Sequence, residues 1–363
     1  MCLINICRSW VEQQGRYETK LLYLKSIFSH SMIRFGIVGT GRISDWVLKG
    51  ASQDPRIRIT AVCSRTSEAA KAFLKRNPFA EGAKIYTSVD AMASDPEVDA
   101  VYIGTPNQTH CDYTLRCLEA GKHVLCEKPL AINAAEGRLM VDKARSTGLL
   151  LMEAMVSTLN PNFIEAASHI SEIAPIFKYS SSFCQYSSKY EALKRGEVAT
   201  SFKPGTAGAL RDIGVYTIYP MVALFGKPLA VNGSLRTVQT PEGLADVHGT
   251  ACLEYEDMDA TLTWSKSYDS FQPTEIAGEN GNIILDEIHI ARKAEIVPHA
   301  APTSGQGPKP GRTALCEGLP YNEYYYEFKE FADLMEQGRR ESSINSLDTS
   351  LTVLEIIDQL LER

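Results

Sequence analysis

A lysine that directly follows a short apolar run is the residue of this chain best suited to chemistry. The run His123–Cys126 reads as a buried parallel strand, and Glu127-Lys128-Pro129 comes next. Parallel sheets bind their ligands at the carboxyl ends of the strands, so Lys128 is expected beside a bound molecule. An ammonium group there can exchange a proton with a hydroxyl or carbonyl group while a nicotinamide exchanges hydride. The alternative is a solvated surface charge.

A glycine turn upstream of this lysine predicts a dinucleotide site. The strand Ile33–Val38 leads into the turn, and a helical pattern follows it. Gly39 allows a tight turn, and Gly41 lets the backbone approach a pyrophosphate at the helix N-terminus. Glycines also make ordinary turns, so the prediction depends on the alternation of strands and helices that continues to Cys126. The predicted cofactor contacts in the turn are Gly39, Thr40, Gly41, Arg42 and Ile43.

The end of the second strand indicates which dinucleotide binds. An NAD site usually places an acid there for the ribose hydroxyls, but the strand Ile59–Cys63 ends in Ser64-Arg65-Thr66. The Arg65 guanidinium, assisted by Ser64, is suited to the 2′-phosphate of NADP. The alternative is a solvated arginine before a helix. We therefore expect NADP, with NAD as the second possibility.

A further turn after the fourth strand belongs to the same ligand edge. Pro106 stiffens it, and Asn107 and His110 are expected to hydrogen-bond the nicotinamide ribose or to cap and pack the next helix. For His110 we favour capping and packing. The predicted cofactor contacts outside the glycine turn are Ser64, Arg65, Thr105, Pro106, Asn107, His110, Glu127 and Lys128.

Length and composition set the class of protein. A chain of 363 residues with 44% apolar and 22% charged residues is expected to form about two globular domains. No long uncharged apolar run predicts a membrane partner, and the net charge of −7 argues against nucleic acid. The nine cysteines lack paired or metal-site spacing, so we expect a reduced, cytoplasmic protein without a metal. Residues 1–31 lack the pattern of a signal peptide, and we expect translation to begin at Met32.

Several of these segments together resemble the Gfo/Idh/MocA family of NAD(P)-dependent oxidoreductases. They are Gly39–Ser44, Thr105–Asn107 with His110, and Glu127–Pro129, joined later in the chain by Met152–Ala154 and Asp212–Tyr216. The resemblance covers nearly the whole chain from Met32. The tyrosine at position 216 is most similar to the dihydrodiol dehydrogenase and NADP-dependent xylose dehydrogenase branch.

The resemblance implies an α/β fold with two domains. An N-terminal Rossmann domain with a doubly wound parallel sheet is expected over 32–153, after a non-native or disordered leader over 1–31. A substrate-binding α/β domain with an open, mostly antiparallel sheet is expected over 154–345, and a C-terminal helix over 346–363. Such a sheet often makes a dimer face, so we expect a homodimer or higher homo-oligomer.

The second half of the chain contains patterns that agree with this implication. Strands are predicted at Ile176–Tyr186, Ala230–Val238, Ala251–Tyr255, Ala260–Trp264 and Asn282–Leu285, and helices at Asn322–Gln337 and Ser346–Leu361. The segment Ile296–Glu317 is rich in Pro, Gly and Ser and is predicted to be a surface loop.

A helix beginning near Asp212 would place Tyr216 one turn further on the same face. The resemblance places this helix opposite the nicotinamide, so Lys128, Asp212 and Tyr216 are the predicted catalytic residues. The Lys128 ammonium is expected to lower the pKa of Tyr216, so that Tyr216 or Lys128 moves the proton. Asp212 would orient the substrate hydroxyl or hold the lysine. In the alternative, Tyr216 is core packing and Asp212 is a helix N-cap.

Three functions are consistent with these residues. The first is an NADP-dependent oxidoreductase that transfers a hydride between the nicotinamide and a hydroxyl or carbonyl group of a sugar or cyclic trans-diol. The alternatives on this fold are a cofactor-dependent glycosidase and an NAD(P)-sensing regulator. The expected partner is a small polyol or sugar, and its identity stays open because Met155–Asn160 and Gly205–Arg211 depart from many relatives.

Overall fold

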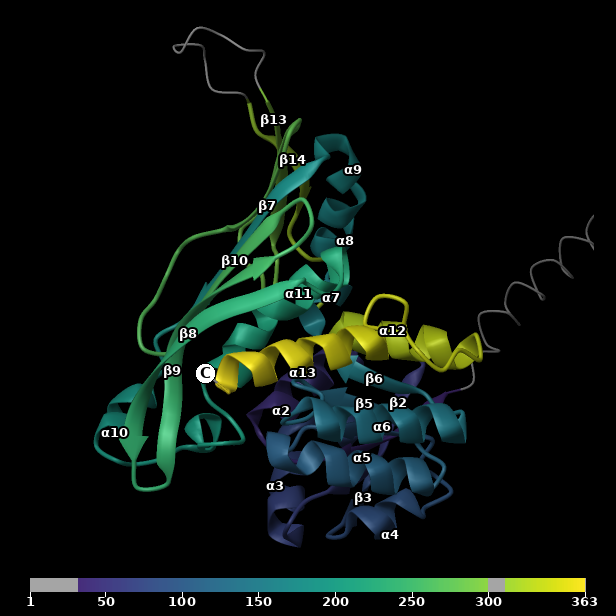
Figure 1. Ribbon diagram of the computed structural model, residues 1–363. Helices are drawn as coiled ribbons and strands as arrows, with labels where there is room; N and C mark the ends of the chain where they lie inside the picture. The colour runs from purple at the N-terminus through teal and green to yellow at the C-terminus, as the bar shows by residue number, and fades with distance from the viewer. Residues whose placement is uncertain (1–31, 300–310, 363) are drawn as a thin grey trace, which may run out of the picture.

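The computed structural model describes residues 32–299 and 311–362, which form two β-sheets with their covering helices (Figure 1). The predicted leader over 1–31 lies outside the described residues, as do residues 300–310 of the predicted loop.

The first sheet has six parallel strands in the order β3-β2-β1-β4-β5-β6. Its strands are β1 (Ile33–Val38), β2 (Ile57–Cys63), β3 (Lys84–Tyr86), β4 (Ala100–Ile103), β5 (His123–Glu127) and β6 (Leu151–Ala154). The strand order reverses between β1 and β4, which is the position where doubly wound sheets bind ligands. The predicted Rossmann sheet is therefore confirmed.

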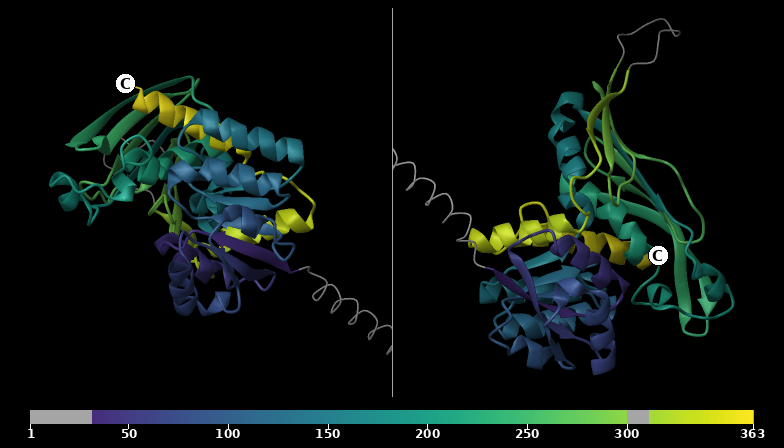
Figure 2. Two further views of the ribbon diagram at one scale, coloured as in Figure 1. Left: turned by 90° about the horizontal axis from the view of Figure 1, so that it is seen from below. Right: turned by 180° about the vertical axis from the view of Figure 1, so that it is seen from behind.

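Helices cover both faces of this sheet, as the views in Figure 2 show. One face carries α2 (Arg42–Ala51), α3 (Ser67–Arg76) and the late helix α12 (Tyr325–Glu336). The other face carries α4 (Val89–Ala93), α5 (His110–Glu119), α6 (Ala134–Thr147) and the first half of α13 (Leu347–Leu361).

The aromatic residues of α12 anchor it to the first sheet. Phe328 and Phe331 are fully buried, with ring centroids 5.2 and 5.3 Å from the ring of Phe35 on β1. Aromatic pairs at this spacing add to the free energy gained by burying their apolar area. Phe328 and Phe331 are thus core residues, and they fix α12 against the first sheet.

The second sheet has eight strands in the order β14-β13-β12-β11-β7-β10-β9-β8. All neighbours are antiparallel except β7 and β10, which confirms the prediction of an open, mostly antiparallel sheet. The strands are β7 (Ile176–Cys184), β8 (Ala230–Thr240), β9 (Gly243–Glu254), β10 (Asp259–Ser265), β11 (Thr274–Gly278), β12 (Gly281–Leu285), β13 (Lys293–Pro298) and β14 (Thr313–Glu317).

One face of the second sheet is covered by α8 (Pro161–Ser168), α9 (Ile170–Ile173), α11 (Val215–Phe225) and the second half of α13. The core beneath these helices contains Trp264 and Tyr179, both fully buried. Helix α13 contacts both domains, through α6 and β6 on one side and α11 and β8 on the other (Figure 1).

The predicted surface loop Ile296–Glu317 is wrong at both ends. Residues up to Pro298 belong to β13, and Thr313–Glu317 form β14, which pairs antiparallel with β13. These strands lie at the edge of the sheet, where most of their side chains are exposed or half-buried and show no apolar alternation. Backbone pairing with a neighbouring strand stabilises them, and that information is not local to the segment.

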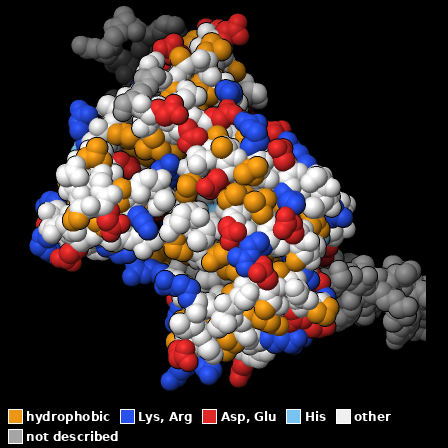
Figure 3. All heavy atoms as spheres, turned by 60° about the horizontal axis from the view of Figure 1, so that its bottom comes forward, with side chains coloured by type: hydrophobic (Ala, Val, Ile, Leu, Met, Phe, Trp, Pro, Cys, Tyr) orange, Lys and Arg blue, Asp and Glu red, His pale blue; other side chains and the backbone are white. Residues whose placement is uncertain are grey.

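No helix within residues 32–299 and 311–362 is both long and apolar enough to span a membrane. On the face seen in Figure 3, lysine and arginine side chains are interspersed with aspartate and glutamate.

Candidate active site

A cleft of about 860 Å³ lies at the carboxyl edge of the first sheet, between the two domains. Loops of the first domain contribute Thr105, Asn107, Glu127 and Lys128, and α2 contributes Arg42 and Ile43. The second domain contributes Phe183, Asp212, Tyr216 and His289. A volume of this size is in the range of small-molecule and cofactor sites.

The glycine turn at one end of the cleft has the geometry of a phosphate cradle. Gly39 has φ of +101°, and a Cβ atom there would lie 2.4 Å from the Gly104 oxygen. Gly41 has open space where a Cβ would be, and it precedes α2 without a side-chain cap. The first N–H groups of α2 are therefore free to bind an anion such as a pyrophosphate. The residues of this turn fit a dinucleotide.

The end of β2 lies beside this turn. The Ser64 hydroxyl is 3.0 Å from the Thr40 hydroxyl, so a hydrogen bond joins the end of β2 to the glycine turn. Arg65 follows with an exposed side chain, and the segment Ser64–Thr66 contains no carboxylate. This arrangement fits a ribose that carries a phosphate better than one that carries free hydroxyls.

His110 has a different place from the one expected of a cofactor contact. Its side chain is fully buried, with Nδ1 2.9 Å from the Pro129 oxygen and Nε2 2.8 Å from the Thr105 oxygen. Burial lowers the pKa of its imidazole. A ring enclosed by main chain cannot reach a ligand, so His110 positions the loops that carry Thr105 and Lys128. Packing was the role favoured for it from the sequence.

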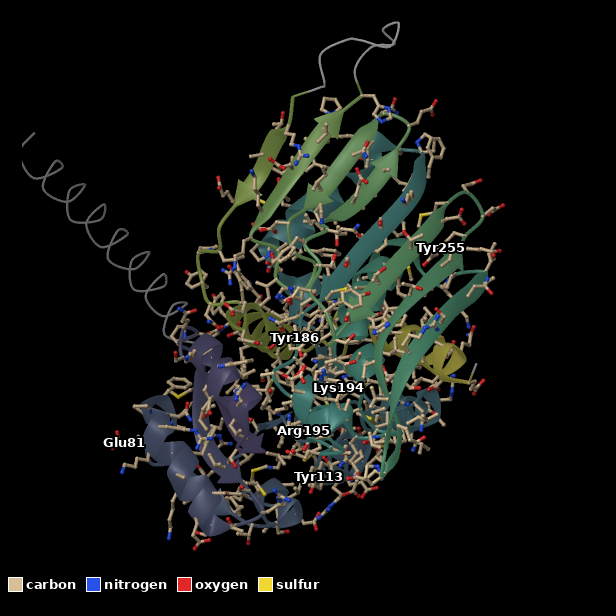
Figure 4. All side chains as sticks on the ribbon, turned by 90° about the vertical axis from the view of Figure 1, so that its left-hand side faces the viewer. Glu81, Tyr113, Tyr186, Lys194, Arg195 and Tyr255 are labelled. Atoms are coloured by element: carbon tan, nitrogen blue, oxygen red, sulfur yellow. The ribbon has the colours of Figure 1, made fainter. Side chains whose placement is uncertain are left out.

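The loop of Asn107 is joined to the second domain. The Asn107 Nδ2 atom donates a hydrogen bond to the Thr206 oxygen at 3.0 Å. Thr206 lies on the segment that follows β7 and carries α10 (Tyr190–Lys194), on which Figure 4 labels Lys194. Gln185 and Lys189 of the same segment line the cleft. This segment therefore forms one wall of the cleft and contacts the loop of Asn107.

Lys128 is held by the second domain. Its Nζ atom donates to the main-chain oxygen of Asp212 at 2.7 Å and lies 3.3 Å from Asp212 Oδ1. The other carboxylate oxygen of Asp212 accepts a short hydrogen bond from Lys266 Nζ, which also donates to the Ser201 oxygen at 3.0 Å. Burial alone would raise the pKa of Asp212, but Lys128 and Lys266 overcome that effect and lower it to about 2. Asp212 is therefore a carboxylate between two ammonium groups.

Asp212 lies in a π-helical turn, Leu210–Gly214, that leads directly into α11. Such turns occur often at functional sites, because they displace a side chain from the regular helical path. Asp246 supports this turn by accepting a hydrogen bond from the Leu210 N–H at 2.7 Å. As the sequence predicted, Asp212 and Tyr216 face the same cleft.

The expected lowering of the Tyr216 pKa by Lys128 is wrong. The Lys128 Nζ atom lies over the tyrosine ring, 4.8 Å from its centroid, and its hydrogen bonds go to Asp212. Burial, followed by the negative charges of Glu127 and Asp212, raises the pKa of Tyr216 well above its ordinary value. The Tyr216 side chain is therefore a neutral phenol that can donate a hydrogen bond.

Several residues of the site were missed in the sequence. Lys266 follows β10 as Lys128 follows β5, so a charge at the end of a strand was the available signal. His289 stacks on Phe183 with ring centroids 4.2 Å apart, and the edge of Tyr216 meets the same Phe183 ring at 5.6 Å. Burial lowers the pKa of His289 to about 4, so it presents a neutral aromatic wall. Within the described chain, no His, Cys, Asp and Glu side chains group as metal ligands would.

The phosphate cradle and the lysine lie on the first domain, and the carboxylate that holds the lysine and the phenol lie on the second, all at one cleft. This arrangement defines a two-domain nicotinamide-dependent oxidoreductase. Comparison with protein families agrees. The family described as "Oxidoreductase family, NAD-binding Rossmann fold" matches residues 33–155, and the "GFO/IDH/MocA C-terminal domain" matches residues 171–284. The chain belongs to the Gfo/Idh/MocA family of oxidoreductases, as its motifs predicted.

Individual relatives extend over nearly the whole chain. The scyllo-inositol 2-dehydrogenase (NADP(+)) IolU of Bacillus subtilis (strain 168) is 37% identical over 333 residues, which is 90% of this chain and 96% of the relative. The trans-1,2-dihydrobenzene-1,2-diol dehydrogenase of Xenopus laevis is 29% identical, over 91% of this chain and 97% of the relative. The structure of KijD10, a 3-ketoreductase from Actinomadura kijaniata in complex with TDP-benzene and NADP, superposes with a TM-score of 0.74 at 25% identity, covering 91% of this chain and 96% of that chain.

Proposed function

We propose that the protein is an NADP-dependent dehydrogenase that moves a hydride between the nicotinamide and a CH–OH group of a ring polyol or sugar. The observation that carries this proposal is the Lys128 ammonium, held by Asp212 of the other domain in the cleft that contains the open glycine turn. The relative named as an NADP(+) scyllo-inositol dehydrogenase supports the cofactor, and this relative and the one named as a trans-dihydrodiol dehydrogenase support the substrate class.

The cofactor supplies the hydride chemistry, and residues of the cleft bind it. The bound nicotinamide supplies the hydride acceptor for oxidation and the hydride donor for reduction. Glycine turn residues Gly39–Gly41 and the start of α2 bind the pyrophosphate, and Arg65 binds the 2′-phosphate.

Lys128 has a proton available for the substrate. An ammonium group has three N–H donors, and two of those of Lys128 are directed at the Asp212 main-chain oxygen and carboxylate. The third is left for the oxygen of the substrate. In reduction Lys128 gives this proton to the carbonyl oxygen and becomes a neutral amine. In oxidation the neutral amine takes the proton from the hydroxyl and becomes the ammonium.

Tyr216 and Asp212 support this transfer. The neutral Tyr216 phenol donates a second hydrogen bond to the substrate oxygen, which stabilises the negative charge that develops there. Both oxygens of the Asp212 carboxylate are engaged by lysines, so Asp212 holds Lys128 and does not orient the substrate hydroxyl. Phe183 and His289 offer a flat wall for the C–H face of a ring.

Cofactor binding and turnover test the proposal together. We would titrate the protein with NADPH and NADH by fluorescence, and then screen inositols, aldoses and trans-dihydrodiols for absorbance change of the nicotinamide. The expected result is tighter binding of NADPH and turnover with a ring polyol. Lys128→Ala should lower turnover by at least about 100-fold with unchanged cofactor affinity, whereas Lys143→Ala, on the far face of the first domain, should change neither.

Other results would point to the alternative functions. Tight NADPH binding with no turnover of any polyol would favour an NAD(P)-sensing regulator. Release of a leaving group without net change of the nicotinamide absorbance would favour a cofactor-dependent glycosidase.

We also propose a homodimer formed through the open face of the second sheet, and a cytoplasmic location. Helices cover one face of that sheet, while the other exposes polar side chains along β7–β10, among them Ser180, Thr250 and Thr261. Light scattering after size-exclusion chromatography should give twice the mass of the chain, and a monomer mass would refute the dimer.

A further inference from the structure

Two buried glutamates lie behind the catalytic lysine. Glu127 is 7% exposed, lines the cleft, and accepts a hydrogen bond from the Tyr102 hydroxyl at 2.7 Å. Its second oxygen accepts from the main-chain N–H of Lys128 at 3.2 Å. Glu327 is 1% exposed and comes one turn after Tyr324, which also lines the cleft. The catalytic mechanism above uses neither carboxyl group.

The Glu327 carboxyl group lacks the partner that a buried polar group needs. Its Oε2 atom is inaccessible to solvent and makes no hydrogen bond with any described residue. An ionised carboxylate in such a place would be strongly unfavourable, whereas a protonated one is tolerated. Burial, followed by the charge of Glu127, raises the pKa of Glu327 well above its ordinary value.

The side chain of Tyr102 connects helix α12 with Glu127. Phe328, the next residue after Glu327, packs on the ring of Tyr102 with centroids 6.2 Å apart. The hydroxyl of this same Tyr102 donates to Glu127. Burial also raises the pKa of Glu127, although Lys128 and Tyr102 act to lower it. The charge of Glu127 disfavours a second charge on the buried Glu327, so the two groups favour the state with a single negative charge.

The groups that face the pair come from several elements. On the cleft side the charges are Lys128 and Asp212, and the titratable phenols are Tyr102 from β4, Tyr216 from α11 and Tyr324 from α12. The neighbouring strand β6 adds the buried carboxyl group of Glu153, whose pKa is raised to about 7 by burial, with a contribution from the charge of Glu127. Helices α2 and α7 (Val156–Leu159) also pack against α12. Their buried polar side chains are the uncharged hydroxyls of Ser44, Ser157 and Thr158, while the exposed cations Arg42 and Lys49 of α2 line the cleft.

We propose that Glu127 and Glu327 together hold one proton in the free protein, release it to solvent when the positively charged oxidised nicotinamide binds, and keep it when the neutral reduced nicotinamide binds. A positive ring beside Glu127 favours the doubly ionised pair, and a neutral ring does not. This inference depends on the proposed function, because it requires a nicotinamide in the cleft. The pair then determines how strongly pH favours binding of one redox form of the cofactor over the other.

The pair then links cofactor affinity to pH. Since proton release accompanies binding of the oxidised form alone, the ratio of the Kd for NADP⁺ to the Kd for NADPH falls as pH rises. For one proton the slope approaches about tenfold per pH unit. The 2′-phosphate titrates in both forms of the cofactor, so its contribution cancels in the ratio.

The test measures binding and not activity. We would determine the Kd of NADP⁺ and NADPH for the whole chain at several pH values from about 6 to 9, and record proton release on binding with a pH indicator in weak buffer. The wild type should show a falling ratio and release about one more proton with NADP⁺ than with NADPH. Glu327→Gln, which keeps the shape of the side chain, should hold the ratio within about twofold and release equal numbers of protons with both forms.

A matched variant on the same helix serves as the control. Glu330→Gln lies on the same helix, where Glu330 accepts a hydrogen bond from Ser342, and it should behave as the wild type. Parallel pH dependence for the two cofactor forms, or equal proton release with both, would overturn the inference even if Glu327→Gln failed to fold. A falling ratio that survives in Glu327→Gln would overturn it as well. If neither cofactor binds, the proposed function itself has failed.

Discussion

The Nζ atom of Lys128 lies 2.7 Å from the main-chain oxygen of Asp212, a residue 84 positions away on the other domain. This hydrogen bond joins the two domains across the cleft, and the Asp212 carboxylate also binds Lys266. The lysine that we propose as catalytic is therefore positioned by the second domain, and its geometry depends on how the two domains meet. A proton donor fixed in this way loses little entropy when substrate binds.

Removing Lys266 should impair turnover, although Lys266 acts through Asp212 and Lys128 and not on the substrate itself. In Lys266→Met, Asp212 keeps one ammonium partner, and turnover should fall by about 10- to 100-fold as Lys128 loses its fixed position. The pKa of Asp212 should rise, so the acid limb of the pH–rate profile should move to higher pH, which simple loss of packing would not cause. Lys266→Arg should restore part of the activity. Lys178→Met, an exposed position on β7, serves as the control, and an unshifted acid limb would contradict the proposed role.

The hydroxyl of Tyr216 should matter for chemistry but not for folding. It makes no hydrogen bond with the described residues, while its ring packs against Phe183. Tyr216→Phe should therefore lower turnover by about 100-fold or more and leave the melting temperature unchanged. Tyr113→Phe, on α5 and labelled in Figure 4, should leave both unchanged. Full activity of Tyr216→Phe would show that Lys128 acts without the phenol.

The two glycines of the turn should respond differently to alanine. Gly39→Ala forces a side chain into a left-handed conformation and against the Gly104 oxygen, so it should destabilise the protein by about 1–3 kcal/mol. Gly41→Ala meets open space and should leave stability unchanged. Both should weaken NADPH binding, because the pyrophosphate needs the space at Gly41. Thermal denaturation and fluorescence titration of the two variants would separate the effects, and equal melting temperatures would refute the difference.

Arg65 should determine preference for NADP. Arg65→Ala should raise the Kd of NADPH by about 10- to 100-fold, which corresponds to the loss of a charge-assisted hydrogen bond. The Kd of NADH, which lacks the 2′-phosphate, should stay the same. Lys71→Ala removes an exposed charge from α3 and provides the control. An equal loss of affinity for NADH and NADPH would mean that Arg65 has no role in selecting the phosphate.

The free energy of unfolding should decrease as the pH is lowered through the range where His123 titrates. Its Nδ1 atom accepts a hydrogen bond from the Leu150 N–H at 2.8 Å, and burial, aided by Arg340, lowers its pKa from 6.5 to about 4. Between these values the unfolded chain binds a proton that the folded protein does not, so the free energy of unfolding decreases as pH falls. The slope from this group is at most about 1.4 kcal/mol per pH unit. In His123→Gln, the urea-denaturation midpoint should depend less on pH between these values than in the wild type. An unchanged pH dependence of the midpoint would contradict this role of His123.

Most of the first domain could be read from the sequence. The strand Ile33–Val38 has the predicted bounds, because apolar spacing and turn residues encode it locally. The edge strands β13 and β14 could not be predicted in this way. Their side chains are mostly exposed or half-buried, and only pairing with a neighbouring strand stabilises them.

By itself, the sequence determined the elements whose chemistry is local: the glycine turn before α2, the lysine after β5, and a tyrosine one turn after Asp212. Only the tertiary structure decided how these groups ionise and what holds them. Lys266 meets Asp212 across 54 positions, and the packing of α12 on Tyr102 accompanies the burial of Glu327, whose pKa the charge of Glu127 helps to raise. The Tyr216 pKa, expected to fall, is raised by burial. The physical reason is that desolvation and Coulomb interactions depend on distances between groups that only folding brings together.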